Sequence, residues 1–135
     1  MKTISTVESF TGGLMAATIT SIPGASKFFK GSLVTYNNEI KQKIGIDTSQ
    51  GVINQEVALD MALKGKNYFK SDICISFTGN AGPEAWDNQP VGLVYIAINN
   101  DVFKLLLKGT IAEIRQQAID FVFYKLEEIY HLKIK

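Results

Sequence analysis

The chain has 135 residues, of which 46% are hydrophobic and 20% charged, and its formal net charge at pH 7 is +1. A near-neutral chain of this size is typical of one small globular domain and shows no sign of a nucleic-acid-binding surface. A small anion can still be held by a helix N-terminus or by a single basic side chain. We therefore expect residues 1–135 to form a single domain that binds no nucleic acid.

The sequence contains one cysteine, Cys74, and one histidine, His131. One cysteine rules out an internal disulfide, and the two residues together are too few for a four-ligand zinc site, so no metal is expected. The scarcity of cysteine favours a reducing, cytoplasmic setting. No apolar run reaches the ~18 residues of a membrane span, and the first residues lack the apolar stretch of a signal peptide.

Hydrophobic periodicity and turn residues divide the chain into alternating strands and helices. The first half is predicted to contain a strand, a helix, a strand and two helices, in that order: 2–7, 14–22, 29–36, 39–44 and 54–69. The second half is predicted to contain three strands, the last two joined as a hairpin, and a long amphipathic helix: 73–78, 91–98, 102–108 and 111–132. This order predicts an α/β fold, a three-layer α/β/α domain with a mixed central sheet.

Three polar loops follow predicted strands, at residues 8–13, 36–41 and 78–82. In open α/β sheets, ligands bind beyond the carboxyl ends of the strands. We therefore expect the three loops to line one crevice.

Ser9 lies in the first of these loops, two residues before Thr11-Gly12-Gly13. The glycines allow another group to approach the backbone closely, and free N–H groups at the start of the next helix can hold an oxyanion or a phosphate. A serine in this place is positioned as a nucleophile. From the residues alone, the more ordinary interpretation is that Ser9 or Thr11 caps the helix.

A nucleophilic serine needs a base. His131 falls in the last turn of the final helix, where we expect it to be solvated, so a Ser-His-Asp triad is disfavoured. Lys41 follows a predicted strand end and can serve as the base if burial or a neighbouring charge lowers its pKa. The hydroxyl of Tyr36 could relay the proton between them. The commoner arrangement is a lysine at the surface and a tyrosine that caps the core.

Three further features are candidates for ligand contact. The loop that contains Thr78, Gly79 and Asn80 can turn backbone amides toward a ligand, although a purely structural loop is equally consistent with the pattern. Trp86 would either stack on a ring or cover the hairpin. Arg115, the only arginine, suits a phosphate or carboxylate, and a surface ion pair is the usual alternative.

The final predicted helix carries aromatic residues around its circumference, and Cys74 lies in a buried strand, where we expect a core residue. Either core packing or contact with a second copy in a homodimer would account for the aromatic residues Phe121, Phe123, Tyr124 and Tyr130.

The motifs of the three loops resemble those of a known family. Val7-Glu8-Ser9-Phe10-Thr11-Gly12-Gly13 is similar to Ala-Glu-Ser-Cys-Thr-Gly-Gly, and Tyr36-Asn37-Asn38-Glu39 with Lys41 is similar to Tyr-Ser-Asn-Glu followed by lysine. Thr78-Gly79-Asn80-Ala81-Gly82-Pro83 resembles Thr-Gly-Ile-Ala-Gly-Pro. These are motifs of the CinA C-terminal domain family, the nicotinamide mononucleotide deamidases. The match runs over about residues 5–98, in order and with compatible spacing.

The resemblance implies a single CinA C-terminal-like domain that converts nicotinamide mononucleotide to nicotinate mononucleotide and ammonia in pyridine-nucleotide recycling, without metal or cofactor. It implies that Ser9 is the nucleophile, that Tyr36 and Lys41 activate it, and that Thr78 belongs to the site. The small-molecule nucleotide substrate is then expected to contact Thr11, Gly12, Gly13, Thr78, Gly79, Asn80 and Arg115. The amides near Gly12 and Gly13 would bind either the oxyanion or the ligand phosphate.

The chain also departs from the family pattern. Phe10 replaces a cysteine, Asn80 replaces an apolar residue, and the segment 84–89 lacks the usual glycine run. Two alternatives therefore stand beside the deamidase: a non-catalytic nucleotide-binding or regulatory module of the same fold, and a hydrolase of another small amide. The presence of Ser9, Tyr36 and Lys41 together favours an enzyme.

Overall fold

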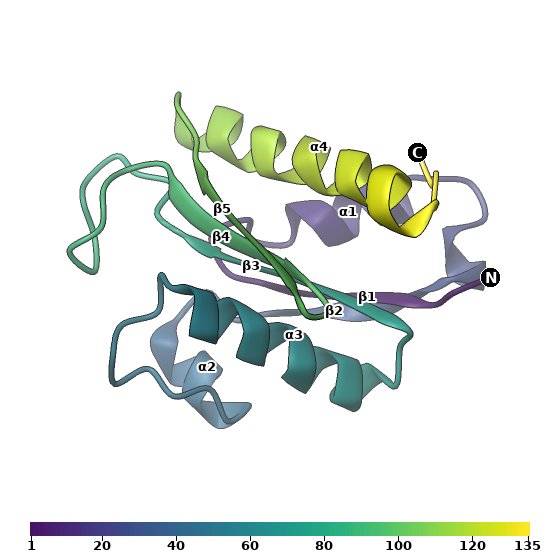
Figure 1. Cartoon of the computed structure of the whole chain (residues 1–135), viewed down its shortest axis with the longest axis horizontal. Coiled ribbons are helices and arrows are strands. Elements are labelled where there is room, and N and C mark those ends of the chain that lie inside the picture. Colours follow the sequence, from purple (N-terminus) through teal and green to yellow (C-terminus); the bar gives the residue numbers. More distant parts are fainter.

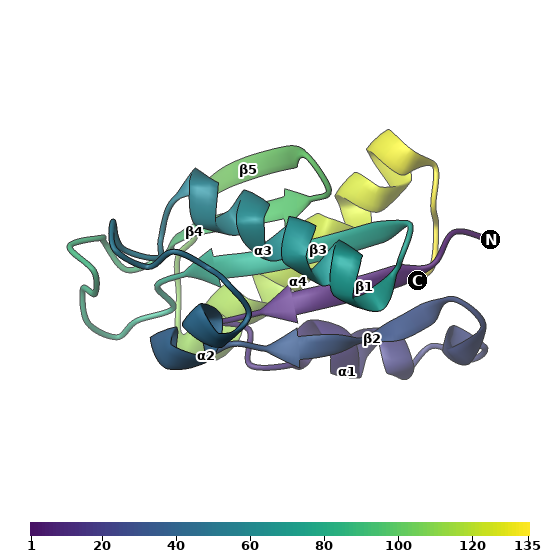
Figure 2. The same cartoon turned by 90° about the horizontal axis from the view of Figure 1, so that it is seen from below.

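The computed structural model describes all 135 residues and contains one five-stranded sheet, with strand order β2-β1-β3-β4-β5 (Figure 2). The strands are β1 (Ile4–Glu8), β2 (Phe29–Val34), β3 (Ile73–Gly79), β4 (Leu93–Ile98) and β5 (Asp101–Leu106). The helices are α1 (Leu14–Thr20), α2 (Asn38–Lys43), α3 (Gln55–Phe69) and α4 (Ile111–Tyr130), together with a short 3₁₀ helix (Ala25–Lys27).

The sheet lies between two layers of helices, with α1 and α4 on one face and α2 and α3 on the other (Figure 1). Strands β2, β1 and β3 are parallel, whereas β4 and β5 pair antiparallel at one edge. The predicted α/β/α fold with a mixed central sheet is confirmed, and every predicted strand and helix is present. The last helix ends two residues earlier than predicted, at Tyr130, because His131 adopts a left-handed φ of 56°.

Strand β3 is central, and all seven of its residues are buried. Because successive side chains of a strand point to opposite faces, β3 supplies both cores. Ile73, Ile75 and Phe77 pack in the larger core beneath α1 and α4. Cys74 packs in a smaller core beneath α3, as expected for a core cysteine.

Helix α4 begins with a capping box between Thr110 and Glu113 and buries one apolar stripe. Of its aromatic residues, Phe121 packs edge to face on Phe103, and the hydroxyl of Tyr130 donates to Asp101 of β5, whereas Tyr124 is exposed. Core packing therefore accounts for part of the aromatic set. None of the helices combines the length and apolarity that crossing a membrane requires.

The strand register brings the carboxyl ends of β2, β1 and β3 to one edge of the sheet, with Glu8 opposite both Val34 and Phe77. The chain termini lie toward the other end of the molecule (Figure 1). Residues that follow these three strands are separated widely in sequence, yet they are neighbours here. This edge is where parallel sheets bind ligands.

Gly65 of α3 gives the first testable prediction. A Cβ atom at this position would overlap the side chains of Val7 and Cys74, because α3 packs closely on β1 and β3. We expect Gly65→Ala to lower the free energy of unfolding by about 1–3 kcal/mol despite the better helix propensity of alanine. Asn67→Ala, at an exposed position of the same helix, is the control and is expected to have little effect. Urea denaturation of the three proteins checks this, and an unchanged or more stable Gly65→Ala protein would contradict the packing described.

Candidate active site

A buried lysine contacts Ser9. Ser9 directly follows β1, and Lys41 lies in α2, so that the Nζ atom of Lys41 is 2.9 Å from the Oγ atom of Ser9. The same Nζ atom lies 2.6 Å from the carbonyl oxygen of Thr35 and 3.5 Å from that of Tyr36. The side chain of Lys41 is fully buried and takes part in neither of the two salt bridges of the chain. Its neighbours at the amine are therefore oxygen atoms without formal charge.

Burial lowers the pKa of Lys41 from 10.5 to about 8, because the charged ammonium loses its hydration. The uncharged amine has two N–H groups and one lone pair. It can donate to the carbonyls of Thr35 and Tyr36 and accept the hydroxyl proton of Ser9. That is the arrangement of a general base on a nucleophile.

The lowered pKa of Lys41 also works against folding at neutral pH. Because the folded-state pKa lies below the value of the unfolded chain, folding of a protonated chain is opposed. This unfavourable contribution is complete below about pH 8 and disappears as the pH rises toward 10.5. Strongly perturbed groups of this kind cluster at functional sites.

Lys41 lies next to Ser9 without the Tyr36 hydroxyl between them. The sequence suggested that this hydroxyl relays a proton between Lys41 and Ser9, but the two side chains are in direct contact. Tyr36 contributes its carbonyl oxygen to the amine, and its side chain is 65% exposed at the cavity. This geometry permits direct proton transfer between Ser9 and Lys41, and the relay through the Tyr36 hydroxyl stays a prediction.

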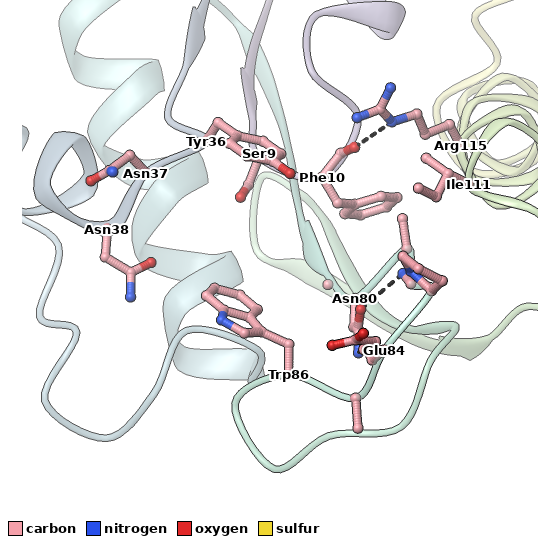
Figure 3. A pocket seen from close by; sticks show the side chains of 15 residues that line it. Ser9, Phe10, Tyr36, Asn37, Asn38, Asn80, Glu84, Trp86, Ile111 and Arg115 are labelled. Carbon is pink, nitrogen blue, oxygen red and sulfur yellow. Dashed lines mark hydrogen bonds between the residues drawn. The ribbon is translucent and has the colours of Figure 1, made fainter.

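Ser9 opens onto a cavity of about 660 Å³, a volume typical of small-molecule sites (Figure 3). The expectation that the three polar loops line one crevice is confirmed, since each contributes to this cavity. The lining residues are Ser9, Phe10, Tyr36, Asn37, Asn38, Gly79, Asn80, Ala81, Gly82, Pro83, Glu84, Ala85, Trp86, Ile111 and Arg115.

The carboxylate of Glu8, a residue that the sequence analysis did not single out, holds the turn that carries Ser9. Glu8 is fully buried, and its two oxygen atoms together accept six hydrogen bonds. The donors are the side chains of Thr6, Thr11 and Ser32 and the backbone N–H groups of Gly13, Met15 and Ala16. A carboxylate, which only accepts, matches six donors and suits the positive N-terminal end of α1. The signal in the sequence is an acidic residue at the end of a buried strand, before a glycine pair that opens a helix.

The amides of Gly12 and Gly13, which were predicted to bind an oxyanion or a phosphate, already have partners within the chain. The N–H of Gly13 donates to Glu8, and that of Gly12 donates to the carbonyl of Ser9. Thr11 is buried and spends its hydroxyl on Glu8. None of these three residues lines the cavity. In this turn, the N–H groups of Phe10 and Thr11 donate no hydrogen bond within the chain.

The third loop contains one residue that the structure keeps away from the cavity. Thr78 is buried, and its hydroxyl donates to the carbonyl of Val52 at 2.6 Å, so its side chain serves the fold. Gly79 and Asn80 do line the cavity. The Asn80 amide nevertheless donates to the carbonyls of Glu84 and Gln89, which shapes the segment that follows.

Arg115 reaches the cavity from α4. Its Nε atom donates to the carbonyl oxygen of Phe10 at 2.7 Å, and it forms no ion pair, so the surface salt bridge considered from sequence is not present. Its two terminal nitrogens have no partner in the chain. His131 is exposed at the end of α4, away from the lining residues, which agrees with the expectation that it is solvated.

Asn38 lies in the second of the three predicted loops but was not singled out as a site residue. It lines the cavity, and its side-chain oxygen is buried without a hydrogen-bond partner. The neighbouring Asn37 caps α2 through its own side chain. Both asparagines line the cavity, and nothing in the sequence indicates which of the two caps the helix and which leaves its side-chain oxygen without a partner.

The fold and site define a three-layer α/β/α protein with a buried serine–lysine pair in a ligand-sized cavity at the carboxyl edge of its parallel strands. The model of the CinA C-terminal domain matches residues 1–130. The chain therefore belongs to the CinA C-terminal domain family.

Relatives and solved structures agree with this assignment. A CinA-like protein of Petrotoga mobilis is 42% identical over 95% of the chain, and a putative competence-damage inducible protein of Halothermothrix orenii is 40% identical over 92%. The chain spans 34% and 33% of the lengths of these two proteins. The crystal structure of the competence/damage inducible protein CihA from Agrobacterium tumefaciens is 30% identical, with a TM-score of 0.87 over 96% of this chain and 86% of that one. A competence damage-inducible protein from Klebsiella pneumoniae, 23% identical, has the same fold, with a TM-score of 0.89 over 96% of this chain and 87% of that one.

The Glu8 network gives the second prediction. Glu8→Gln would turn an NH₂ group toward donors that now meet a carboxylate oxygen, and it would remove the charge at the start of α1. We expect the free energy of unfolding to fall by about 2–4 kcal/mol. Glu39→Gln, an exposed residue in the first turn of α2, is the matched control, with an expected change within about 0.5 kcal/mol. Thermal and urea denaturation measure both, and a Glu8→Gln protein as stable as the parent would contradict the network.

Proposed function

We propose that this chain is an amidohydrolase that converts nicotinamide mononucleotide to nicotinate mononucleotide and ammonia, with Ser9 as nucleophile and Lys41 as general base. The observation that carries the proposal is the 2.9 Å contact between Ser9 Oγ and the buried amine of Lys41 at the wall of the cavity. The choice of nicotinamide mononucleotide rests on the resemblance of the three loop motifs, because the names of the relatives state no substrate.

The reaction follows from this geometry in two stages. Lys41 takes the proton of Ser9 as Oγ attacks the carboxamide carbon, and the resulting ammonium then donates a proton to the departing nitrogen. Ammonia leaves, and the substrate remains as an ester on Ser9. Lys41, again uncharged, removes a proton from the water that attacks the ester. It then returns this proton to Oγ of Ser9 as the ester bond breaks, so the acid product and free Ser9 result.

The negative charge that develops on the carbonyl oxygen needs a donor. The N–H of Phe10 is suited to this task, because it directly follows the nucleophile, belongs to a cavity residue and has no partner in the chain. Arg115 fixes the carbonyl of this same residue. The unpaired terminal nitrogens of Arg115 match a phosphate group, so we assign the nucleotide phosphate to Arg115.

Ammonia release from nicotinamide mononucleotide tests the proposal with three variants. Ser9→Ala removes the nucleophile and Lys41→Met removes the base, so each is expected to lower kcat/KM at least about 1,000-fold. Lys43→Met, an exposed lysine on the same helix, is the matched control and should keep parental activity. Circular dichroism checks that each variant is folded.

The outcomes separate the enzyme from its alternatives. A folded parent that binds the nucleotide by calorimetry but releases no ammonia would refute the deamidase and favour a nucleotide-binding module. Turnover of other small amides with no binding of the nucleotide would keep the serine–lysine mechanism and change the substrate.

The pKa of Lys41 sets the expected pH dependence. Only the uncharged amine accepts the proton of Ser9, so kcat/KM should rise with pH and level off above a midpoint at about pH 8. Below the midpoint it should fall about tenfold per pH unit. Initial rates between about pH 7 and pH 10 measure this profile. A rate that is flat across this range, with chemistry as the limiting step, would show that Lys41 does not act as the base.

A further inference from the structure

Trp86, the only tryptophan of the chain, lines the cavity and is 46% exposed. In Figure 3 its indole lies on the opposite side of the cavity from Ser9 and Tyr36. A large apolar ring left half exposed at a cavity wall is a common feature of binding surfaces for rings.

Trp86 stands at the base of a tight hairpin. Trp86 and Gln89 exchange both backbone hydrogen bonds, N to O at 3.3 and 2.9 Å. The two residues between them, Asp87 and Asn88, both have a φ of 57°. Two consecutive left-handed residues are the mark of a type I′ turn, in which asparagine and aspartate are tolerated.

The hairpin is fastened to the rest of the fold from two sides. The carboxylate of Asp87 accepts the backbone N–H groups of Val52 and Ile53 at 2.7 and 3.2 Å, in the segment before α3. From inside the loop, the Asn80 amide donates to the carbonyls of Glu84 and Gln89 at 2.9 and 3.2 Å. Asn80 and the segment 84–89 are two of the places where the chain departs from the family motifs. The hydrogen bonds show that they form one structural unit that fixes Trp86 at the cavity.

We propose that Trp86 is a specificity-determining residue that stacks on the aromatic ring of the substrate while the attached carboxamide faces Ser9. This inference rests on the proposed function. The ring of nicotinamide mononucleotide is a flat, positively charged pyridinium, which the electron-rich face of an indole attracts by both stacking and cation–π interaction. Trp86 then selects cationic aromatic amides over aliphatic ones, and Asp87 is the positioning residue that holds the indole.

The stacking contact can be observed directly, because all tryptophan fluorescence of the protein comes from Trp86. The experiment uses the Ser9→Ala protein, which binds without turnover, titrated with nicotinamide mononucleotide and, separately, with ribose 5-phosphate, which lacks the ring. We expect saturable quenching by the nucleotide and none by ribose 5-phosphate. Calorimetry on the same samples reports binding independently of fluorescence.

Affinity changes in variants test the same contact. Trp86→Ala should weaken binding of nicotinamide mononucleotide about tenfold or more, whereas Trp86→Phe keeps a ring and should lose less. Asp87→Ala keeps the indole but releases the hairpin, and it should weaken binding, while Asp87→Asn, which retains an acceptor oxygen and tolerates the left-handed turn, should bind more tightly than Asp87→Ala. Tyr68→Ala, an exposed aromatic residue on α3 that is not a cavity residue, is the control with no expected effect.

The outcomes separate this inference from the proposed function. Binding of the nucleotide by calorimetry without quenching, or with unchanged affinity in Trp86→Ala, would overturn the stacking role and leave the deamidase standing. Absence of any binding of the nucleotide would overturn both. Quenching together with the ordered loss of affinity supports the assignment of Trp86.

Discussion

The site depends on keeping an amine without a counter-ion inside the protein, next to a hydroxyl. A buried ammonium is costly, and this chain lowers the cost with two backbone carbonyls rather than with a carboxylate. A carboxylate partner would have favoured the charged form and raised the pKa of Lys41. With uncharged neighbours, burial dominates and the pKa falls to about 8, so a usable fraction of the amine is uncharged near neutral pH.

Glu8 connects the turn that carries Ser9 with the backbone segment that accepts hydrogen bonds from Lys41. Its side chain holds the turn from Thr11 into α1, and its backbone carbonyl accepts the N–H of Thr35 at 2.6 Å and the Thr35 hydroxyl at 3.2 Å. Thr35 in turn offers its own carbonyl to Lys41. The turn next to Ser9 and the backbone carbonyl that holds the Lys41 amine are thus both tied to one buried residue at the end of β1. The position of Ser9 relative to Lys41 is therefore set by strand pairing and not by a flexible loop.

Much of the fold followed from local patterns, because apolar periodicity and glycine or asparagine stops are short-range signals. The convergence of the three loops also followed, since the carboxyl ends of parallel strands share one edge. The hydrogen-bond partners of individual polar groups could not be predicted from the sequence. The amides of Gly12 and Gly13 were expected to be free, and Thr78 was expected at the ligand. In the structure the Gly12 amide donates to the Ser9 carbonyl, the Gly13 amide to Glu8, and the Thr78 hydroxyl to the Val52 carbonyl. The last two partners are brought there by tertiary packing, which local patterns do not show.

The departures from the family motifs gain a physical meaning from the structure. Phe10 in place of a cysteine packs edge to face on Phe77, with ring centroids 6.3 Å apart, so its bulk is absorbed by the core next to Ser9. Asn80 in place of an apolar residue donates hydrogen bonds to the carbonyls of Glu84 and Gln89, the two ends of the glycine-free segment 84–89. Neither change disturbs the contact between Ser9 and Lys41. The sequence showed these replacements, but it did not show the contacts that accommodate them. Those contacts, of Phe10 with Phe77 and of Asn80 with Glu84 and Gln89, form only in the folded chain.

In the proposed reaction Ser9 forms an ester with the substrate after Lys41 removes its proton, and partitioning of this ester between water and hydroxylamine is the decisive test. Hydroxylamine added during turnover of nicotinamide mononucleotide competes with water for the ester and releases Ser9 with formation of a hydroxamate. We expect part of the product to be hydroxamate, with a share that rises with the hydroxylamine added, and we expect the Ser9→Ala protein to form neither hydroxamate nor acid. Turnover that yields only the acid at every hydroxylamine concentration, or hydroxamate formation that survives in Ser9→Ala, would contradict the proposed reaction.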